Sequence, residues 1–135
     1  MPKVQADGLP LPQRYGAILT IVIGISMAVL DGAIANVALP TIATDLHATP
    51  ASSIWVVNAY QIAIVISLLS FSFLGDMFGY RRIYKCGLVV FLLSSLFCAL
   101  SDSLQMLTLA RVIQGFGGAA LMSVNTALIR LIYPQ

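Results

Sequence analysis

The chain has 135 residues, of which 59% are hydrophobic and only 9% charged, whereas about a quarter of the residues in a soluble domain are charged. This composition excludes a water-soluble globular domain, because so few polar residues cannot cover its surface. The net charge of +2 comes without a basic stripe, which argues against nucleic acid as a partner.

Residues 1–16 contain three prolines and no apolar run. They therefore lack the hydrophobic segment and the small-residue cleavage site of a secretory signal. We expect them to form a short disordered lead-in in the cytosol.

Four apolar stretches follow, each close to the roughly 20 residues that a helix needs to cross a bilayer. A soluble domain of this size could not enclose four such helices, so we expect them to be transmembrane helices. The expected helices cover residues 17–39, 54–74, 83–100 and 104–132. The predicted fold class is an all-α integral membrane protein with four transmembrane helices.

The segments between these stretches have the composition of loops. Residues 40–53 are rich in Pro, Thr, Ser and Asp, and they end with Ser52 and Ser53 as candidate N-caps of the second helix. Residues 75–82 hold two glycines and two arginines, and residues 101–103 form a tight turn.

The positions of the basic residues predict the orientation, because positively charged loops stay in the cytosol. If the four helices alternate, six of the basic residues fall on one side and none in the opposite loops. The six are Lys3, Arg14, Arg81, Arg82, Lys85 and Arg130. We therefore expect a multi-pass protein of a bacterial-type inner membrane with a cytosolic N-terminus. Trp55 and Tyr60 are expected at the outer interface, where amphipathic rings are favoured.

The sequence predicts neither a metal site nor an enzyme. The only histidine, His47, lies in a polar segment and is expected to be solvated. Cys86 and Cys98 share one apolar stretch, and helix between them separates them by roughly 18 Å, too far for a disulfide. They are expected to be small buried hydrophobic residues. No nucleophile or phosphate-cradling loop is recognisable either.

Asp31 and Arg111 are ionisable residues deep inside predicted membrane spans. Such residues are costly in lipid and mark functional sites by default. Counting helical rise places both roughly 10–12 Å below the outer surface, so they can form a pair. The alternative is a purely structural ion pair that fixes helix packing, although buried pairs are weak sources of stability.

Each of the two helices carries a distinctive face around its charge. On the fourth helix the face mixes polar and small residues, which is not typical of a lipid-facing surface: Arg111, Gln114, Gly115, Gly118, Met122 and Asn125. On the first helix small and polar residues recur at a spacing of four: Gly16, Thr20, Gly24, Ala28, Gly32 and Asn36. The sequence therefore predicts close helix packing at Gly24, Gly32, Gly115 and Gly118.

Three stretches resemble the major facilitator superfamily, and within it the fourteen-helix branch of drug:proton antiporters. Residues 30–40, LDGAIANVALP, are similar to the helix-one signature LDxTIVNVALP. Residues 72–82, SFLGDMFGYRR, resemble the loop motif GxLaDRxGRRx, and residues 107–120, LTLARVIQGFGGAA, resemble the helix-four motif LxxxRxxQGxGaA. The three motifs occur in order and cover nearly all of the chain from Tyr15.

Some motif positions differ from the family pattern. Ala33 and Ala35 replace the Thr and Val of the first signature. In the loop motif, Ser72, Met77 and Tyr80 stand where the family has Gly, Arg and Arg.

The resemblance implies that Asp31 exchanges protons near a cationic substrate and that Arg111 and Gln114 belong to the same coupling site. Physical chemistry is consistent with this role. Burial favours the neutral form of a carboxyl group and a nearby guanidinium favours the charged form, so the two effects together can set when a proton binds.

The resemblance also implies that Asp76, Gly79, Arg81 and Arg82 form a conformational latch in the cytosol. Gly79 permits the tight turn that the latch needs. The alternative is that the arginines only set the topology.

By the same resemblance, the chain is an incomplete N-terminal bundle of one three-helix repeat and the first helix of the next. The implied partners are the lipid bilayer, a hydrophobic or cationic small-molecule substrate and the missing C-terminal helices of the same transporter. A proton gradient is the implied energy source, and no cofactor is expected.

Two other functions stay open. A small four-helix multidrug exporter acting as a dimer suits the length, but those proteins resemble one another through a helix-one Glu, and this chain has no Glu. A non-transporting membrane accessory or remnant is the other.

The orientation can be tested by cysteine labelling. We expect a membrane-impermeant thiol reagent added outside intact cells to label Ser53→Cys but not Tyr80→Cys, because the basic loop is retained in the cytosol. Labelling of Tyr80→Cys from outside would overturn the topology.

Overall fold

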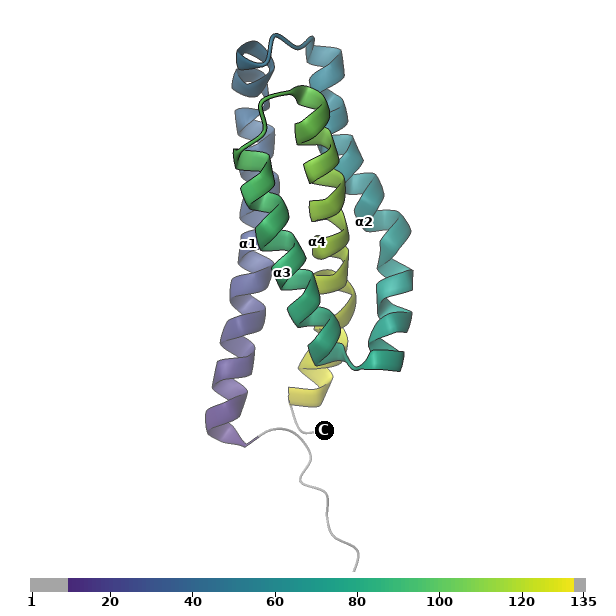
Figure 1. The fold of residues 1–135 in the computed structure, drawn as a ribbon. Coiled ribbons are helices and arrows are strands. Elements are labelled where there is room, and N and C mark those ends of the chain that lie inside the picture. The colour runs from purple at the N-terminus through teal and green to yellow at the C-terminus, as the bar shows by residue number, and fades with distance from the viewer. Residues whose placement is uncertain (1–9, 133–135) are drawn as a thin grey trace, which may run out of the picture.

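The computed structural model describes residues 10–132, apart from the side chain of residue 131, as four long helices joined by short turns (Figure 1). The helices are α1 (Leu11–Asp45), α2 (Pro50–Phe78), α3 (Tyr80–Ala99) and α4 (Leu104–Ile132). All four are long and apolar enough to cross a membrane, and no strand occurs within the described residues. The predicted all-α membrane fold is therefore confirmed.

The first connection is much shorter than predicted. Residues 40–53 were expected to form a loop, but α1 continues through Pro40 to Asp45, and only residues 46–49 connect it to α2. Membrane helices tolerate an internal proline. One turn after it, the Thr44 hydroxyl donates to the carbonyl oxygens of Thr41 and Pro40, at 2.7 Å and 3.2 Å.

The predicted N-caps of α2 are also wrong. Thr49 is the cap, and its side-chain oxygen accepts a hydrogen bond of 3.2 Å from the backbone N–H of Ser52. Pro50 then occupies the first helical position, where its missing N–H costs nothing. Ser53 is only 2% exposed, and its hydroxyl donates to the Thr49 carbonyl. The exposed Ser52 is therefore a better labelling position than Ser53.

The predicted lead-in is shorter than residues 1–16, because α1 already begins at Leu11. Pro10 caps this helix, and Pro12 lies in its first turn, where no intrahelical N–H is needed. Residues 1–9 lie outside the described residues, and so does the predicted lead-in over that range.

Gly79 alone separates α2 from α3. Its φ of 96° lies in the region that residues with a Cβ rarely adopt, which confirms that a glycine is needed for this turn. The third connection, between α3 and α4, is also short, and the Ser103 hydroxyl accepts a hydrogen bond from the backbone N–H of Met106.

The short turns make the four helices alternate in direction. Figure 1 shows the start of α1, the Gly79 turn and the end of α4 at one end of the bundle, and the other two connections at the opposite end. The predicted basic residues that lie in the described range therefore gather at one end: Arg14, Arg81, Arg82, Lys85 and Arg130.

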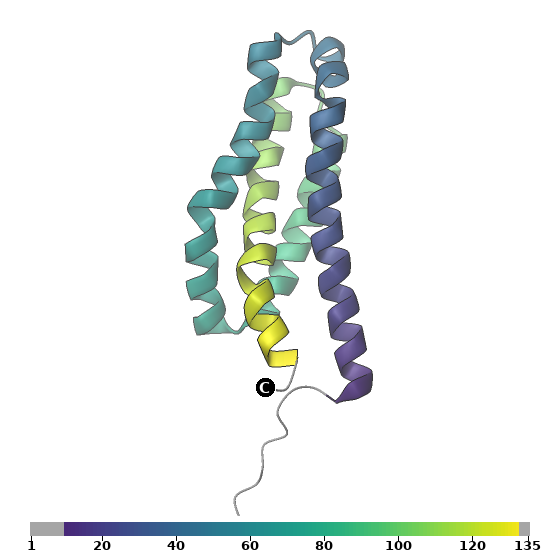
Figure 2. The ribbon, with the colours of Figure 1, turned by 180° about the vertical axis from the view of Figure 1, so that it is seen from behind.

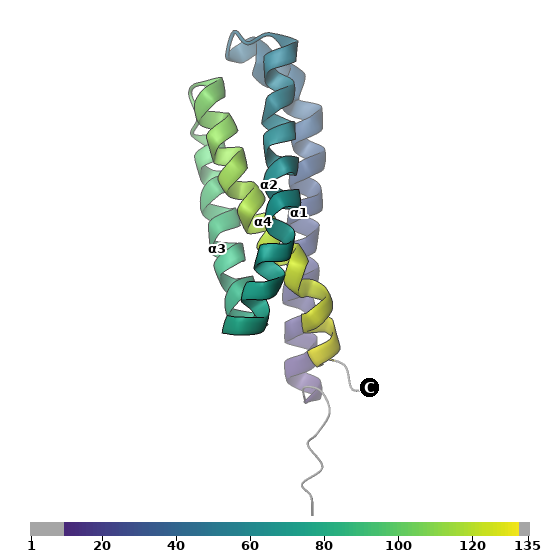
Figure 3. The same cartoon turned by 90° about the vertical axis from the view of Figure 1, so that its right-hand side faces the viewer.

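α4 is the central helix of the bundle. It packs mainly against α2 and α3, and viewed from behind it lies between α2 and α1 (Figure 2). Figure 3 shows that it runs obliquely to α1 and α2. Its buried side chains form the core together with aromatic residues of the neighbouring helices: Tyr60, Tyr84, Phe91, Leu121, Val124 and Leu128.

By contrast, α1 is loosely packed. Only Ile21, Gly24 and Ala43 are buried among its residues. Its contacts with the other helices are few, whereas α2 and α3 each pack extensively against α4. α1 therefore depends on a small number of specific contacts for its place in the bundle.

Close backbone packing between α3 and α4 predicts that Gly117 cannot be enlarged. A Cβ at Gly117 would lie 2.7 Å from the backbone nitrogen of Phe91 and 2.9 Å from the carbonyl oxygen of Gly87. We expect Gly117→Ala to lower the free energy of unfolding by about 1–3 kcal/mol, because the two backbones must separate. Thermal unfolding in detergent micelles, followed by circular dichroism, measures the change.

Gly16→Ala is the matched control, because a Cβ there would meet no heavy atom within 4 Å. It removes a flexible residue from a helix and should leave stability unchanged or slightly raised. Equal effects of the two substitutions would contradict the close packing of α3 on α4.

Candidate functional site

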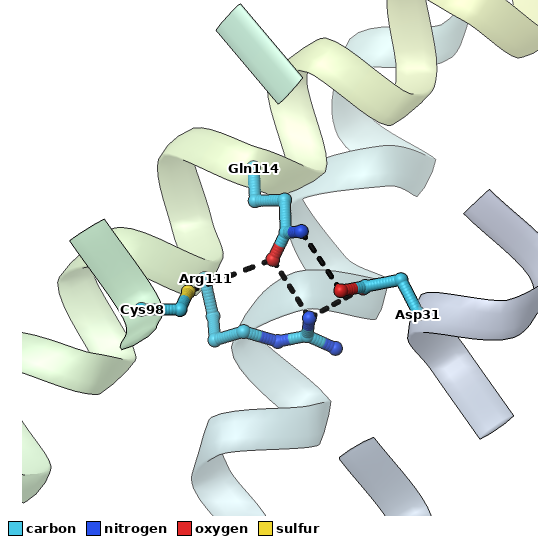
Figure 4. Close-up of polar contacts among 4 residues, drawn as sticks. All are labelled: Asp31, Cys98, Arg111 and Gln114. Carbon is cyan, nitrogen blue, oxygen red and sulfur yellow. Dashed lines mark hydrogen bonds and ion pairs between the residues drawn. The ribbon is translucent and has the colours of Figure 1, made fainter. Parts of the chain in front are cut away.

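Asp31 of α1 and Arg111 of α4 form an ion pair inside the bundle. The Nη1 atom of Arg111 lies 2.6 Å from Oδ2 of Asp31, and the two side chains are 5% and 21% exposed respectively. Figure 4 shows both side chains pointing toward each other from their helices. The predicted facing of these two residues at similar depth is confirmed, whereas their role in coupling stays a prediction.

Gln114 completes a closed polar cluster with this pair, and it is fully buried. Its Oε1 accepts a hydrogen bond of 2.7 Å from Arg111 Nη1, and its Nε2 donates one of 3.0 Å to Asp31 Oδ1. The amide has one orientation that satisfies both neighbours, since an arginine only donates and a carboxylate only accepts. Both carboxylate oxygens of Asp31 are thereby engaged.

Cys98 connects α3 to the same cluster, which the sequence did not predict. Its Sγ lies 3.6 Å from Gln114 Oε1 and donates a weak hydrogen bond to it (Figure 4). Both cysteines are free thiols, as expected. However, Cys86 is exposed and Cys98 only half-buried, so neither is the buried hydrophobic residue that was predicted. An apolar stretch reveals that a helix lies in lipid, but not which of its faces points inward.

Tyr60 of α2 was predicted at the outer membrane interface, and this is wrong. It is 6% exposed, and the guanidinium carbon of Arg111 lies 4.3 Å from the centre of its ring. A signal for this burial was present in the sequence. Tyr60 shares one helical face with the small residues Ala63 and Ser67, which are also buried.

The predicted glycine contacts are present at three of four positions. A Cβ at Gly24 would clash with the hydroxyl of Tyr84, and one at Gly115 would clash with Ala63 and with the carbonyl oxygen of Tyr60. A Cβ at Gly118 would lie 3.2 Å from the hydroxyl oxygen of Tyr60.

Gly32 is not at a close contact in this structure, because a Cβ there would meet no heavy atom within 4 Å. The spacing of four along α1 places Gly32 and Gly24 on one face, but α1 meets a neighbouring side chain closely at Gly24 alone among its three glycines. Gly32 instead lines a cavity between helices.

This cavity of about 340 Å³ lies between α1, α2 and α4. Its lining is mostly apolar, with Tyr60, Gln61 and Asn125 as polar residues. The Oδ1 atom of Asn125 is buried and has no hydrogen-bond partner among the described residues. The volume falls in the range of pockets for small molecules, about 300–1,000 Å³.

The predicted latch residues lie at the Gly79 turn, away from the buried cluster. Tyr80 donates a hydrogen bond from its hydroxyl to a carboxylate oxygen of Asp76. Arg81 and Arg82 are exposed. Tyr80, which stands where the family motif has Arg, is thus a neutral partner of Asp76.

Comparison with known proteins gives a family match and several relatives. The family model of the Major Facilitator Superfamily matches residues 21–135. The chain is 34% identical over 124 residues to the riboflavin transporter RibZ of Clostridioides difficile (strain 630), an alignment that covers 92% of the chain and 27% of RibZ. It is 35% identical over 127 residues to the tetracenomycin C resistance and export protein of Streptomyces glaucescens, covering 94% of the chain and 23% of that protein.

A third relative is MdtD of Salmonella newport (strain SL254), whose name refers to multidrug resistance. The chain is 40% identical to it over 112 residues, which covers 83% of the chain and 24% of MdtD. The chain therefore spans about a quarter of the length of the curated relatives it matches.

The buried pair predicts how stability responds to the loss of either charge. We expect Asp31→Asn to lower the free energy of unfolding by up to about 3–5 kcal/mol, because it leaves the Arg111 guanidinium buried without a counter-charge. Adding Arg111→Gln to Asp31→Asn should restore part of the loss, since no unpaired charge remains. Thermal unfolding of the three variants in detergent micelles checks this.

Asp102→Asn is the control, because Asp102 is an exposed aspartate at the turn between α3 and α4. It should change stability by less than about 0.5 kcal/mol. If the double variant is less stable than Asp31→Asn alone, the unpaired cation is not the cause of the loss.

Proposed function

The chain belongs to the Major Facilitator Superfamily, and from this premise we propose that it is the N-terminal part of a proton-coupled exporter of hydrophobic or cationic small molecules. The proposed mechanism is drug:proton antiport, with a proton gradient as the energy source. Relatives named for drug resistance and export, together with their roughly fourfold greater length, support the proposal.

The observation that carries this proposal is the contact of Asp31 with Arg111 and Gln114 inside a membrane span. A proton on Oδ2 removes the charge that attracts Arg111, and a proton on either oxygen removes an acceptor site from the cluster. The contact between α1 and α4 is therefore weaker when Asp31 is neutral. Because α1 has few buried residues, a weaker contact with α4 leaves α1 with little else to hold it in the bundle.

Antiport follows if substrate and proton exclude each other at one carboxylate. A cationic substrate near Asp31 stabilises the charged carboxylate and so favours release of the proton, while a proton removes the charge that attracts the cation. The mostly apolar cavity between α1, α2 and α4 offers a place for the hydrophobic part of such a molecule. Two residues of its lining lie close to Asp31 along α1: Ala28 about one turn before it and Gly32 directly after it.

In the proposed orientation, the protein lies in the inner membrane. The end of the bundle that carries the Gly79 turn faces the cytosol. Asp76, Gly79, Arg81 and Arg82 form the latch at that end. Fixed by Tyr80, the Asp76 carboxylate can meet the positive N-terminal end of a helix from the rest of the transporter.

The alternatives differ in how well they agree with these findings. A small dimeric four-helix exporter has a different fold, so membership of the superfamily counts against it. A non-transporting remnant stays open until transport is measured. One relative is named as a riboflavin transporter, without a direction of transport, so the test must also measure the direction.

The proposal predicts different behaviour of this chain and of the longer protein encoded by a reading frame that continues past residue 135. The 135-residue chain should insert in the membrane but should not carry out coupled export, because alternating access needs two bundles that rock about a shared site. Substrate efflux measured in inverted vesicles with an imposed pH gradient provides the test. Gradient-dependent transport by the short chain alone would support the dimeric exporter instead.

In the longer protein, Asp31→Asn should abolish gradient-driven transport, since Asn keeps the size of Asp but cannot carry a proton. Arg111→Lys should impair transport through lost geometry, because Lys keeps the charge but lacks the planar fork that holds a carboxylate. Asp102→Asn serves again as the control. Undiminished transport by Asp31→Asn would remove Asp31 from the mechanism.

A further inference from the structure

Tyr60 contacts Arg111 through the face of its ring, with neither a counter-charge nor a hydrogen bond. The guanidinium carbon lies 4.3 Å from the ring centre, well within the roughly 6 Å over which a cation is attracted to an aromatic face. The ring's negative face and the guanidinium's positive charge attract each other whether or not Asp31 is charged.

α4 fixes the position of this ring through two glycines. A Cβ at Gly118 would lie 3.2 Å from the Tyr60 hydroxyl, and a Cβ at Gly115 would lie 2.8 Å from the Tyr60 carbonyl oxygen. The side chain and backbone of Tyr60 thus lie directly against the helix that carries Arg111. The ring is buried against α4, and its other side borders the cavity between α1, α2 and α4.

The partners of Arg111 divide into those that depend on the charge of Asp31 and those that do not. Nη1 bonds both Asp31 and Gln114, and Nε is buried with no hydrogen-bond partner among the described residues. The titratable or charged groups around the cluster are Asp31 from α1, Tyr60 from α2, Cys98 from α3 and Arg111 itself from α4. When Asp31 is neutral, the ring of Tyr60 and the amide oxygen of Gln114 remain to hold the cation.

We propose that Tyr60 is a positioning residue that keeps the Arg111 guanidinium in place while Asp31 is neutral. The inference deepens the proposed function, since it assumes that Asp31 alternates between charged and neutral forms. Without the ring, a buried cation that has lost its counter-charge would move toward water, and Asp31 would no longer find its partner on losing the proton. With the ring, Arg111 stays ready to bind Asp31 again.

The test is a set of double variants of this chain, unfolded by heat in detergent micelles, with Asp31→Asn standing for the neutral carboxyl. We expect Tyr60→Leu to lower the unfolding temperature by about 4 °C more in the Asp31→Asn background than in the unaltered chain. Tyr60→Phe keeps the aromatic face and should show no such excess. An equal fall in both backgrounds for Tyr60→Leu, or an excess for Tyr60→Phe as large as that for Tyr60→Leu, would overturn the proposal.

Phe91→Leu is the matched control. Phe91 is also a buried aromatic residue, and its backbone lies against Gly117 of α4, so it belongs to the contact between α3 and α4 and not to α1 or the Asp31 cluster. Its loss should therefore lower the unfolding temperature by the same amount in both backgrounds. A general weakening of the bundle by Asp31→Asn would instead make both leucine substitutions more damaging.

A second measurement keeps the proposal testable if Tyr60→Leu prevents folding. Phenylalanine and its increasingly fluorinated analogues can be placed at residue 60 by nonsense suppression. Fluorine draws electron density from the ring face while nearly preserving ring size, so stability in the Asp31→Asn background should fall stepwise with fluorination. Stability independent of fluorination would show that the ring acts only by packing.

Transport separates this inference from the proposed function. In the longer protein, Tyr60→Leu should lose gradient-driven transport, and Tyr60→Phe should restore part of it. If Asp31→Asn leaves transport unchanged, the proposed function fails, whereas the unfolding experiments on Tyr60 still decide whether the ring holds Arg111. If Asp31→Asn abolishes transport and Tyr60→Leu does not, the positioning role fails and the proposed function stands.

Discussion

A carboxylate inside a membrane span needs a partner, and the contact of Asp31 with Arg111 and Gln114 supplies it. The position of α1 depends on a small number of contacts, and this cluster is one of them. Besides the cluster, α1 is fixed by the close approach of Tyr84 at Gly24, and few of its residues are buried. One of the few specific contacts of α1 is thus also one that a single proton can weaken.

The other three helices are held together in a different way. Glycines at residues 87, 115 and 117 bring backbones so close that a Cβ would clash, and dispersion contacts of this kind do not respond to protonation. The molecule therefore combines a closely packed unit of α2, α3 and α4 with one helix attached through charge. In the proposed mechanism, proton binding alters the attachment of α1 and leaves the packing of this unit unchanged.

The sequence predicted those features of the structure that depend on hydrophobicity and on the placement of charge. Hydrophobicity and length indicated four helices, and a charge within such a stretch made Asp31 and Arg111 stand out. The inward face of α2 was not predicted, because Tyr is equally at home at an interface and in a core, so Tyr60 was misplaced. Residues 40–45 read as a loop, yet they are helical, since one proline removes only one backbone hydrogen bond from a long helix. The contact of Cys98 with Gln114 was not predicted, because a thiol is only a weak hydrogen-bond donor and a cysteine in an apolar stretch gives no sign of a polar partner.

The distance of Asp31 from Arg111 along the chain also matters during synthesis. The two residues are 80 positions apart, so at about 5–20 residues per second Asp31 is made roughly 4–16 s before its counter-ion. Throughout this interval α1 carries a carboxyl group whose counter-ion has not yet been made. The ion pair between α1 and α4 can therefore form only after the other three helices have been synthesised, which makes it a late step in assembly of the bundle.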